Sequence, residues 1–166
     1  MERLPKRRSL RLPEYDYGAN GAYFVTVCTE GKRCILGHVV GGGVLDAPYV
    51  RLTEYGMLAE KTLLEMGAFY KDITIDKYVI MPNHVHFIIS INACDGPSRT
   101  PAPTNARLPA FISTWKRFTN RNAGFPFWQR NYYDHVIRNE ADYLRIWQYI
   151  DNNPAHWAED EYYSEL

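Results

Sequence analysis

The segment from 72 to 91 limits the fold more than any other stretch of this sequence. It holds two runs rich in β-branched and aromatic residues, DITIDKYVIMP over 72–82 and HVHFIISI over 84–91, which meet at Pro82-Asn83. Proline and asparagine favour a bend, and each run has the length and composition of a strand. We therefore expect a β-hairpin in the middle of the chain.

Strand and helix patterns alternate on both sides of this hairpin. AYFVTVCTE over 22–30 predicts a strand that ends at Gly31, and 38–53 predicts a glycine-linked hairpin or an irregular loop. Apolar residues then recur at helical spacing from Leu52 to Met66, with Thr53 as the expected cap and Gly67 as the expected stop.

The second half repeats the alternation. Helical spacing returns between Leu108 and Phe118, and the aromatic segment 125–139 predicts a strand. A last helix is expected to begin at Asn139 as its cap and to end at Pro154. The order β, α, β, β, α, β, α predicts an α+β fold of the ferredoxin-like (RRM-like) type: an antiparallel sheet with helices on one face, plus a C-terminal helix.

The length of 166 residues suits one domain, so we expect 1–166 to form a single unit with a basic tail over 1–14 and a flexible loop over 92–107. Lys plus Arg equals Asp plus Glu at 19 each, which excludes a strong overall field for a polyanion. The 3 cysteines form no CxxC pair, and neither a signal peptide nor a membrane-spanning run is present. We expect a cytoplasmic protein with no membrane role.

His84 and His86 are the first candidates for chemistry. Side chains alternate along a strand, so both imidazoles project from one face, opposite the apolar face of Val85 and Phe87. Two converging imidazoles have the geometry that one metal ion needs, although a purely structural role for the pair is the alternative. Two histidines alone do not complete a metal site.

The C-terminal helix offers further groups. Its predicted apolar stripe comprises Tyr143, Leu144, Ile146, Trp147 and Ile150. Tyr149 lies on the flank of this stripe, and Asn153 lies four residues on, along the same side of the helix. A tyrosine that packs its ring and exposes its hydroxyl is the alternative reading, and Asn153 precedes a proline, which weakens the helical spacing.

Three segments, MPNHVHFII, FWQRNYYDHVIRNEADY and YIDNNP, resemble the signature segments of REP-associated tyrosine transposases, within the single-tyrosine HUH transposases. The resemblance runs from about Tyr15 to Trp157. It implies that His84 and His86 are the HUH histidines, that Tyr149 is the nucleophile and that Asn153 is the third metal ligand. The family's ferredoxin-like fold, with the tyrosine on a late helix, agrees with the element order above.

The implied activity is cleavage and transfer of single-stranded DNA beside a hairpin, through a 5′-phosphotyrosine intermediate. A phenol with a pKa of about 10 is a poor nucleophile at neutral pH, so the phosphate must be polarised and held in line. A divalent ion supplies both effects. Imidazole and amide ligands with open coordination positions suit Mg²⁺ or Mn²⁺, and zinc is the alternative that the sequence does not exclude.

Candidate DNA contacts combine positive charge with aromatic residues, as single-stranded DNA sites commonly do. They are Lys116, Arg117, Arg121, Gln129 and Arg130. A solvated helix face, with the nearby aromatics in the core, is the alternative. His135 and Arg138, from the DHVIR segment, are expected to support the site.

Two other functions compete with strand transfer. One is a non-catalytic nucleic-acid-binding module on the same fold, which would leave the combination of His84, His86, Tyr149 and Asn153 unexplained. The other is a metal-dependent hydrolase whose histidine pair activates water, and which would tolerate loss of Tyr149. The DNA sequence recognised, and whether the protein forms a homodimer, stay open.

Overall fold

The computed structural model describes residues 21–43, 46–92 and 107–164. The predicted basic tail over 1–14 and nearly all of the predicted loop over 92–107 lie outside the described residues. Of the helices described, none is long and apolar enough to cross a membrane.

The centre of the molecule is a four-stranded sheet in the order β4-β5-β1-β6, with every neighbouring pair antiparallel. Its strands are β1 (Gly21–Cys28), β4 (Ile73–Ile80), β5 (His84–Ile91) and β6 (Tyr133–Ile137). The turn after β4 contains Pro82 and Asn83, so the predicted central hairpin is confirmed. Pairing of β5 with β1 sets Cys28 opposite His84 and Thr26 opposite His86.

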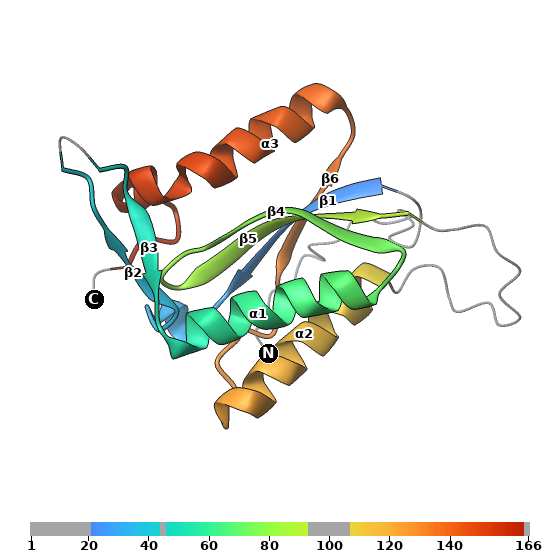
Figure 1. The fold of residues 1–166 in the computed structure, drawn as a ribbon, viewed down its shortest axis with the longest axis horizontal. Coiled ribbons are helices and arrows are strands. Elements are labelled where there is room, and N and C mark those ends of the chain that lie inside the picture. Colours follow the sequence, from blue (N-terminus) through green and yellow to red (C-terminus); the bar gives the residue numbers. More distant parts are fainter. Residues whose placement is uncertain (1–20, 44–45, 93–106, 165–166) are drawn as a thin grey trace, which may run out of the picture.

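Helices α1 (Glu54–Phe69) and α2 (Arg107–Ala123) cover one face of the sheet (Figure 1). With the four strands they give the β-α-β-β-α-β order of the ferredoxin-like fold, which confirms the predicted fold class. A separate two-stranded sheet of β2 (Gly37–Val40) and β3 (Tyr49–Leu52) precedes α1. Of the two expectations for this region, the glycine-linked hairpin is therefore the one observed.

The caps of α1 and α3 (Glu140–Asn152) match the sequence prediction at their starts. The Thr53 side chain accepts from the Gly56 amide, and the Asn139 side chain accepts from the Asp142 amide. The predicted stop at Gly67 was wrong, because α1 continues to Phe69. A Cβ at Gly67 would lie 2.9 Å from Cγ1 of Ile75, so this glycine allows α1 to approach β4 closely.

Helix α3 lies on the opposite face of the sheet from α1 and α2 (Figure 1). Ile146 and Ile150 pack there against Phe24 and Ile88. Leu144, predicted in the apolar stripe, is instead 52% exposed. The less apolar face of β5 is buried as well: His84, His86 and Ile88 are at most 1% exposed, because α3 and the chain after it cover this second face.

The aromatic segment 125–139 is only partly a strand. β6 begins at Tyr133, while Phe127 and Trp128 lie buried in irregular chain, and Trp128 forms a single bridge with Thr29. After α3, the chain turns through the short helix η3 (Asn153–Glu159), and residues 160–164 run back across the sheet face that carries His84.

Candidate metal and tyrosine site

The two histidines of β5 lie side by side beneath the C-terminal chain. Their ring centroids are 4.4 Å apart, and both side chains are almost fully buried. Burial lowers the pKa of His84 to about 3, and burial together with the neighbouring His84 holds the pKa of His86 well below its usual value. Both imidazoles are therefore neutral at pH 7, the form that binds metal ions.

Hydrogen bonds orient the His84 ring. The Asn83 side-chain nitrogen donates to the carbonyl oxygens of Lys32 and Tyr162, at 3.1 and 2.8 Å. The Asn83 side-chain oxygen therefore faces Nδ1 of His84, 2.8 Å away, and accepts a hydrogen bond from its N–H group. This leaves Nε2 of His84 with a free lone pair, and this buried atom has no hydrogen-bond partner.

His86 connects the sheet to α3. Its Nδ1 lies 2.8 Å from the Thr26 hydroxyl on the neighbouring strand, and its Nε2 lies 3.4 Å from the Tyr149 hydroxyl. The Tyr149 ring also meets Phe24 edge-on, with centroids 6.0 Å apart. The tyrosine of the terminal helix and the histidine pair thus face one another.

The Tyr149 side chain is 41% exposed, so a substrate can reach it. Partial burial, and then the negative charge of Asp160, raise the pKa of Tyr149 to about 12, while the nearby Asn153 side chain opposes the shift. At neutral pH the group is a protonated phenol, which needs help to act as a nucleophile.

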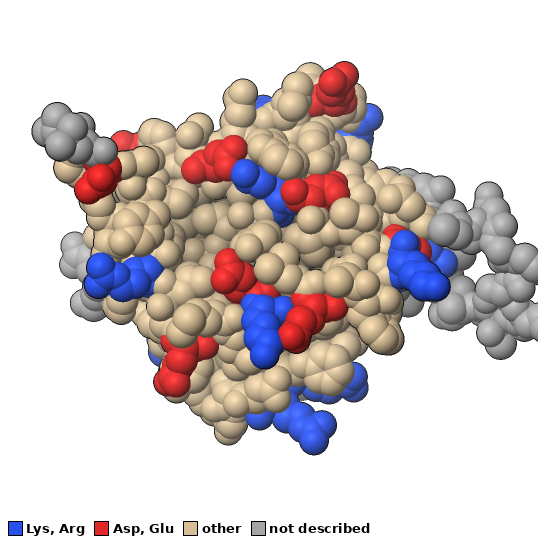
Figure 2. Space-filling view, in the orientation of Figure 1, with Lys and Arg blue, Asp and Glu red and all other residues tan. Residues whose placement is uncertain are grey.

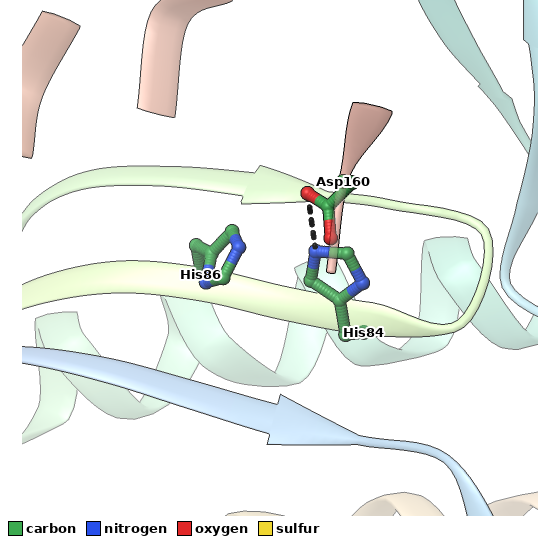
Figure 3. A group of neighbouring side chains, drawn as sticks. All are labelled: His84, His86 and Asp160. Carbon is green, nitrogen blue, oxygen red and sulfur yellow. Dashed lines mark ion pairs between the residues drawn. The ribbon is translucent and has the colours of Figure 1, made fainter. Parts of the chain in front are cut away.

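Asp160 completes a group that could hold a metal ion. Ligand atoms of His84, His86 and Asp160 all lie within 4.8 Å of one another, and the Asp160 carboxylate is 3.9 Å from Nε2 of His84 (Figure 3). The Asn153 side-chain nitrogen donates to Asp160 at 3.1 Å, while its buried side-chain oxygen has no hydrogen-bond partner. Two neutral imidazoles, a carboxylate and the Asn153 side-chain oxygen fit a divalent cation, and two of these ligand atoms, Nε2 of His84 and the Asn153 oxygen, lack a hydrogen-bond partner.

A cavity of about 560 Å³ opens beside these groups. Its lining includes His86, Tyr149 and Tyr162, together with His135 from β6 and Arg145 from α3. The Tyr162 ring also stacks near His84, at 4.8 Å between centroids. A polar substrate entering the cavity would therefore meet the exposed tyrosine next to the histidines.

The predicted DNA contacts lie on α2 and the segment after it, and α2 is on the other face of the sheet (Figure 1). The Lys116 ammonium donates to the carbonyl oxygens of Gln129, Arg130 and Asn131, at 2.8, 3.4 and 3.1 Å. Lys116 thus holds this segment in place. Arg117, Arg121 and Arg130 are exposed. The DNA contacts expected for these three arginines, for Gln129 and for Lys116 stay predictions.

Of the two predicted supporting residues, the structure brings only His135 to the site. His135 lines the cavity, and its Nε2 is hydrogen-bonded to the Asp142 carboxylate of α3 at 2.8 Å. The same carboxylate accepts a hydrogen bond from Arg145 at 2.6 Å. Arg138 is exposed and does not line the cavity. The structure also brings His84, His86, Tyr149 and Asn153 together, while their roles in metal binding and catalysis stay predictions.

Sequence reasoning missed several residues at this site. Asp160 and Tyr162 follow the last predicted helix, and no periodicity links them to β5, which lies much earlier in the chain. Asp142 lies in the first turn of α3, where an acidic residue needs no role beyond stabilising the helix. Arg145 carried a usable signal, because it lies four residues before Tyr149 and therefore on the same side of the helix.

Comparison of the structure with solved structures confirms the predicted fold. A REP-associated tyrosine transposase, solved bound to a REP hairpin, matches with a TM-score of 0.60 and 22% sequence identity, over 87% of this chain and 73% of that one. The chain therefore has the fold of a REP-associated tyrosine transposase.

Sequence comparison then defines the family. No protein-family model matches the chain. An uncharacterised protein of Haemophilus influenzae strain Rd is 35% identical, over 95% of this chain and 93% of that protein. The chain belongs to the same family as this Haemophilus influenzae protein.

Proposed function

We propose that the protein is a metal-dependent, transposase-like enzyme that cleaves and transfers single-stranded DNA through Tyr149. The observation that carries the proposal is the position of the Tyr149 hydroxyl, 3.4 Å from Nε2 of His86, next to the unpartnered Nε2 of His84. A tyrosine placed only for packing would not need to meet two buried, neutral histidines.

In the proposed step, the Tyr149 oxygen attacks the phosphorus of a phosphodiester. A bond forms between this oxygen and phosphorus, and the bond between phosphorus and the 3′ oxygen breaks. The departing 3′ oxygen gains a proton in place of the one that Tyr149 loses. The products are a 5′-phosphotyrosine and a free 3′-hydroxyl, and because the phosphodiester is exchanged and not hydrolysed, the reverse step can join a strand.

His84, His86 and Asp160 would hold the cation, with the side-chain oxygen of Asn153 as a further ligand. When bound, Mg²⁺ or Mn²⁺ would polarise a phosphate oxygen and offset the negative charge of Asp160 beside Tyr149. Asn83 and Thr26 would fix the orientation of the two imidazoles.

The proposed substrate is single-stranded DNA beside a hairpin. Support comes from the solved transposase of the same fold, which is bound to a REP hairpin. Carried to this chain, the likeness suggests that a folded stem positions the strand, while the cavity beside Tyr149 accepts the phosphate to be cleaved.

The test is a covalent-adduct assay with hairpin oligonucleotides and Mn²⁺, resolved on a denaturing gel. A 3′ label is needed, because the fragment that stays on the protein is attached through its 5′ end. We expect an adduct with the unaltered protein, none with Tyr149→Phe, and none when EDTA replaces Mn²⁺.

Tyr162→Phe is the matched control, since Tyr162 lines the same cavity. It should keep the adduct. Cleavage that survives Tyr149→Phe would favour a metal-dependent hydrolase, and binding without any adduct would favour a non-catalytic module. Either result would contradict the proposed function.

A further inference from the structure

Arg145 lies one helical turn before Tyr149 on α3, and both side chains line the cavity beside the histidines. Among the described residues that line this cavity, Arg145 alone carries a permanent positive charge. Glu161 adds a negative charge to the same cavity. Among the side chains that line the cavity, this guanidinium is therefore the main source of attraction for a phosphate that approaches Tyr149.

The balance of charge makes a single cation more important. Lys plus Arg equals Asp plus Glu, and the acidic and basic side chains of the described residues are interspersed over the face that Figure 2 shows. Such a surface does not concentrate a polyanion at long range. Affinity for DNA here must come from individual cations at the right positions.

Two side chains hold Arg145 in place. The Asp142 carboxylate accepts from a terminal nitrogen of Arg145 at 2.6 Å through one oxygen, and faces Nε2 of His135 at 2.8 Å through the other. Asp142 itself is fixed by its backbone bond to the Asn139 cap. The chain of contacts runs from β6 to α3 along the cavity.

A simple surface ion pair would look different. The pair Lys61–Glu65 on α1 joins side chains that are 72% and 66% exposed, and such pairs contribute little to stability. Asp142 is only 16% exposed and has two partners, while Arg145 stays 69% exposed. The Asp142 carboxylate thus holds Arg145 and His135 in position, and the other nitrogens of the Arg145 guanidinium remain available for a ligand.

We propose that Arg145, positioned by Asp142 and His135, binds a phosphate of the DNA strand adjacent to the phosphate that Tyr149 attacks. The inference rests on the proposed function and adds a strand-binding position to it. Arginine suits this role because its planar fork can bind two phosphate oxygens at once.

The first test measures binding apart from chemistry. Hairpin oligonucleotides are titrated by fluorescence anisotropy against Tyr149→Phe protein, with and without Arg145→Gln, at several salt concentrations. We expect Arg145→Gln to weaken binding by about fivefold. It should also reduce the slope of log K against log salt by the amount that one phosphate contact contributes, about one unit. Lys61→Gln, which removes one exposed charge on the other face, should change neither value.

The second test locates the phosphate. After the cleavage position is mapped with the unaltered protein, each flanking phosphate is replaced in turn by a neutral methylphosphonate. One replacement should weaken DNA binding by the protein that keeps Arg145 about as much as Arg145→Gln does. The same replacement should have no further effect on DNA binding by the Arg145→Gln protein. Independent, additive effects at every position would overturn the proposal.

Variants of the supporting residues test positioning. Arg145→Lys keeps the charge but lacks the fork, so it should restore only part of the affinity. Asp142→Asn should weaken binding less than Arg145→Gln. If the unaltered protein binds DNA and forms the adduct, and Arg145→Gln matches it in both assays, the inference about Arg145 fails while the proposed function stands. If the unaltered protein does neither, the proposed function fails and the inference fails with it.

Discussion

The two faces of the four-stranded sheet differ in what covers them. On one face, α1 and α2 enclose a large apolar core that includes Phe87 and Trp115. On the other face, α3 contributes a small apolar cluster around Ile88, and the rest of the surface is occupied by polar groups such as His84 and His86. Alternate side chains of the same strand, β5, supply both faces.

The comparison shows how one strand separates stability from chemistry. Apolar burial on the α1/α2 face stabilises the fold, since the hydrophobic contribution grows with apolar area removed from water. The α3 face buries neutral imidazoles with an unpartnered nitrogen, an arrangement that is costly for stability but useful for binding a cation. Mutations on the two faces should therefore affect different measurements.

The largest effect on stability is expected at Phe87, which is fully buried and lies 6.0 Å from Trp115 between ring centroids. Phe87→Ala should lower the free energy of unfolding by about 3–5 kcal/mol, through lost burial and a cavity. Tyr149→Phe should change it by no more than about 0.5 kcal/mol. Urea denaturation measures both, and similar losses for the two variants would break the comparison.

Metal binding should stabilise the protein through the α3 face. At a Mn²⁺ concentration of about 100 times its dissociation constant, the free energy of unfolding should rise by about 2.7 kcal/mol if the ion binds the proposed site, which exists only in the folded protein. Thermal unfolding with and without Mn²⁺ measures the shift.

Ligand variants sharpen this metal test. Asp160→Asn and His86→Gln should reduce the Mn²⁺ shift. His156→Gln should leave it intact, because this exposed histidine pairs with Glu159 and lies outside the cluster. A shift that survives in all three variants would place the metal elsewhere.

A smaller effect is expected for Lys116, whose ammonium holds the chain after α2 in place. Burial lowers the pKa of its ammonium to about 8, yet three carbonyl oxygens accept from it. Lys116→Met should cost about 1–2 kcal/mol of stability through loss of these bonds. Arg121→Gln, at an exposed position of the same helix, should stay within about 0.5 kcal/mol, and equal losses would contradict the structural role.

The fold was predictable because its signals are local. The bend at Pro82, the caps at Thr53 and Asn139 and the helical spacing on α1 and α2 all depend on residues a few positions apart. Errors occurred where a distant element intervened. Gly67 did not stop α1, since its lack of a side chain serves contact with β4.

By itself, the sequence determined that His84 and His86 share one side of a strand, because side-chain alternation is a property of the extended backbone. Through the resemblance of three segments, it also predicted that Tyr149 and Asn153 act with them, and the structure places both residues beside the histidines. Only the tertiary structure decided that α3 crosses the sheet over these histidines, that Asp160 returns from beyond the last helix to join them, and that Asp142 holds Arg145 at the cavity. These contacts depend on how separate elements pack, and no local spacing in the chain encodes that packing.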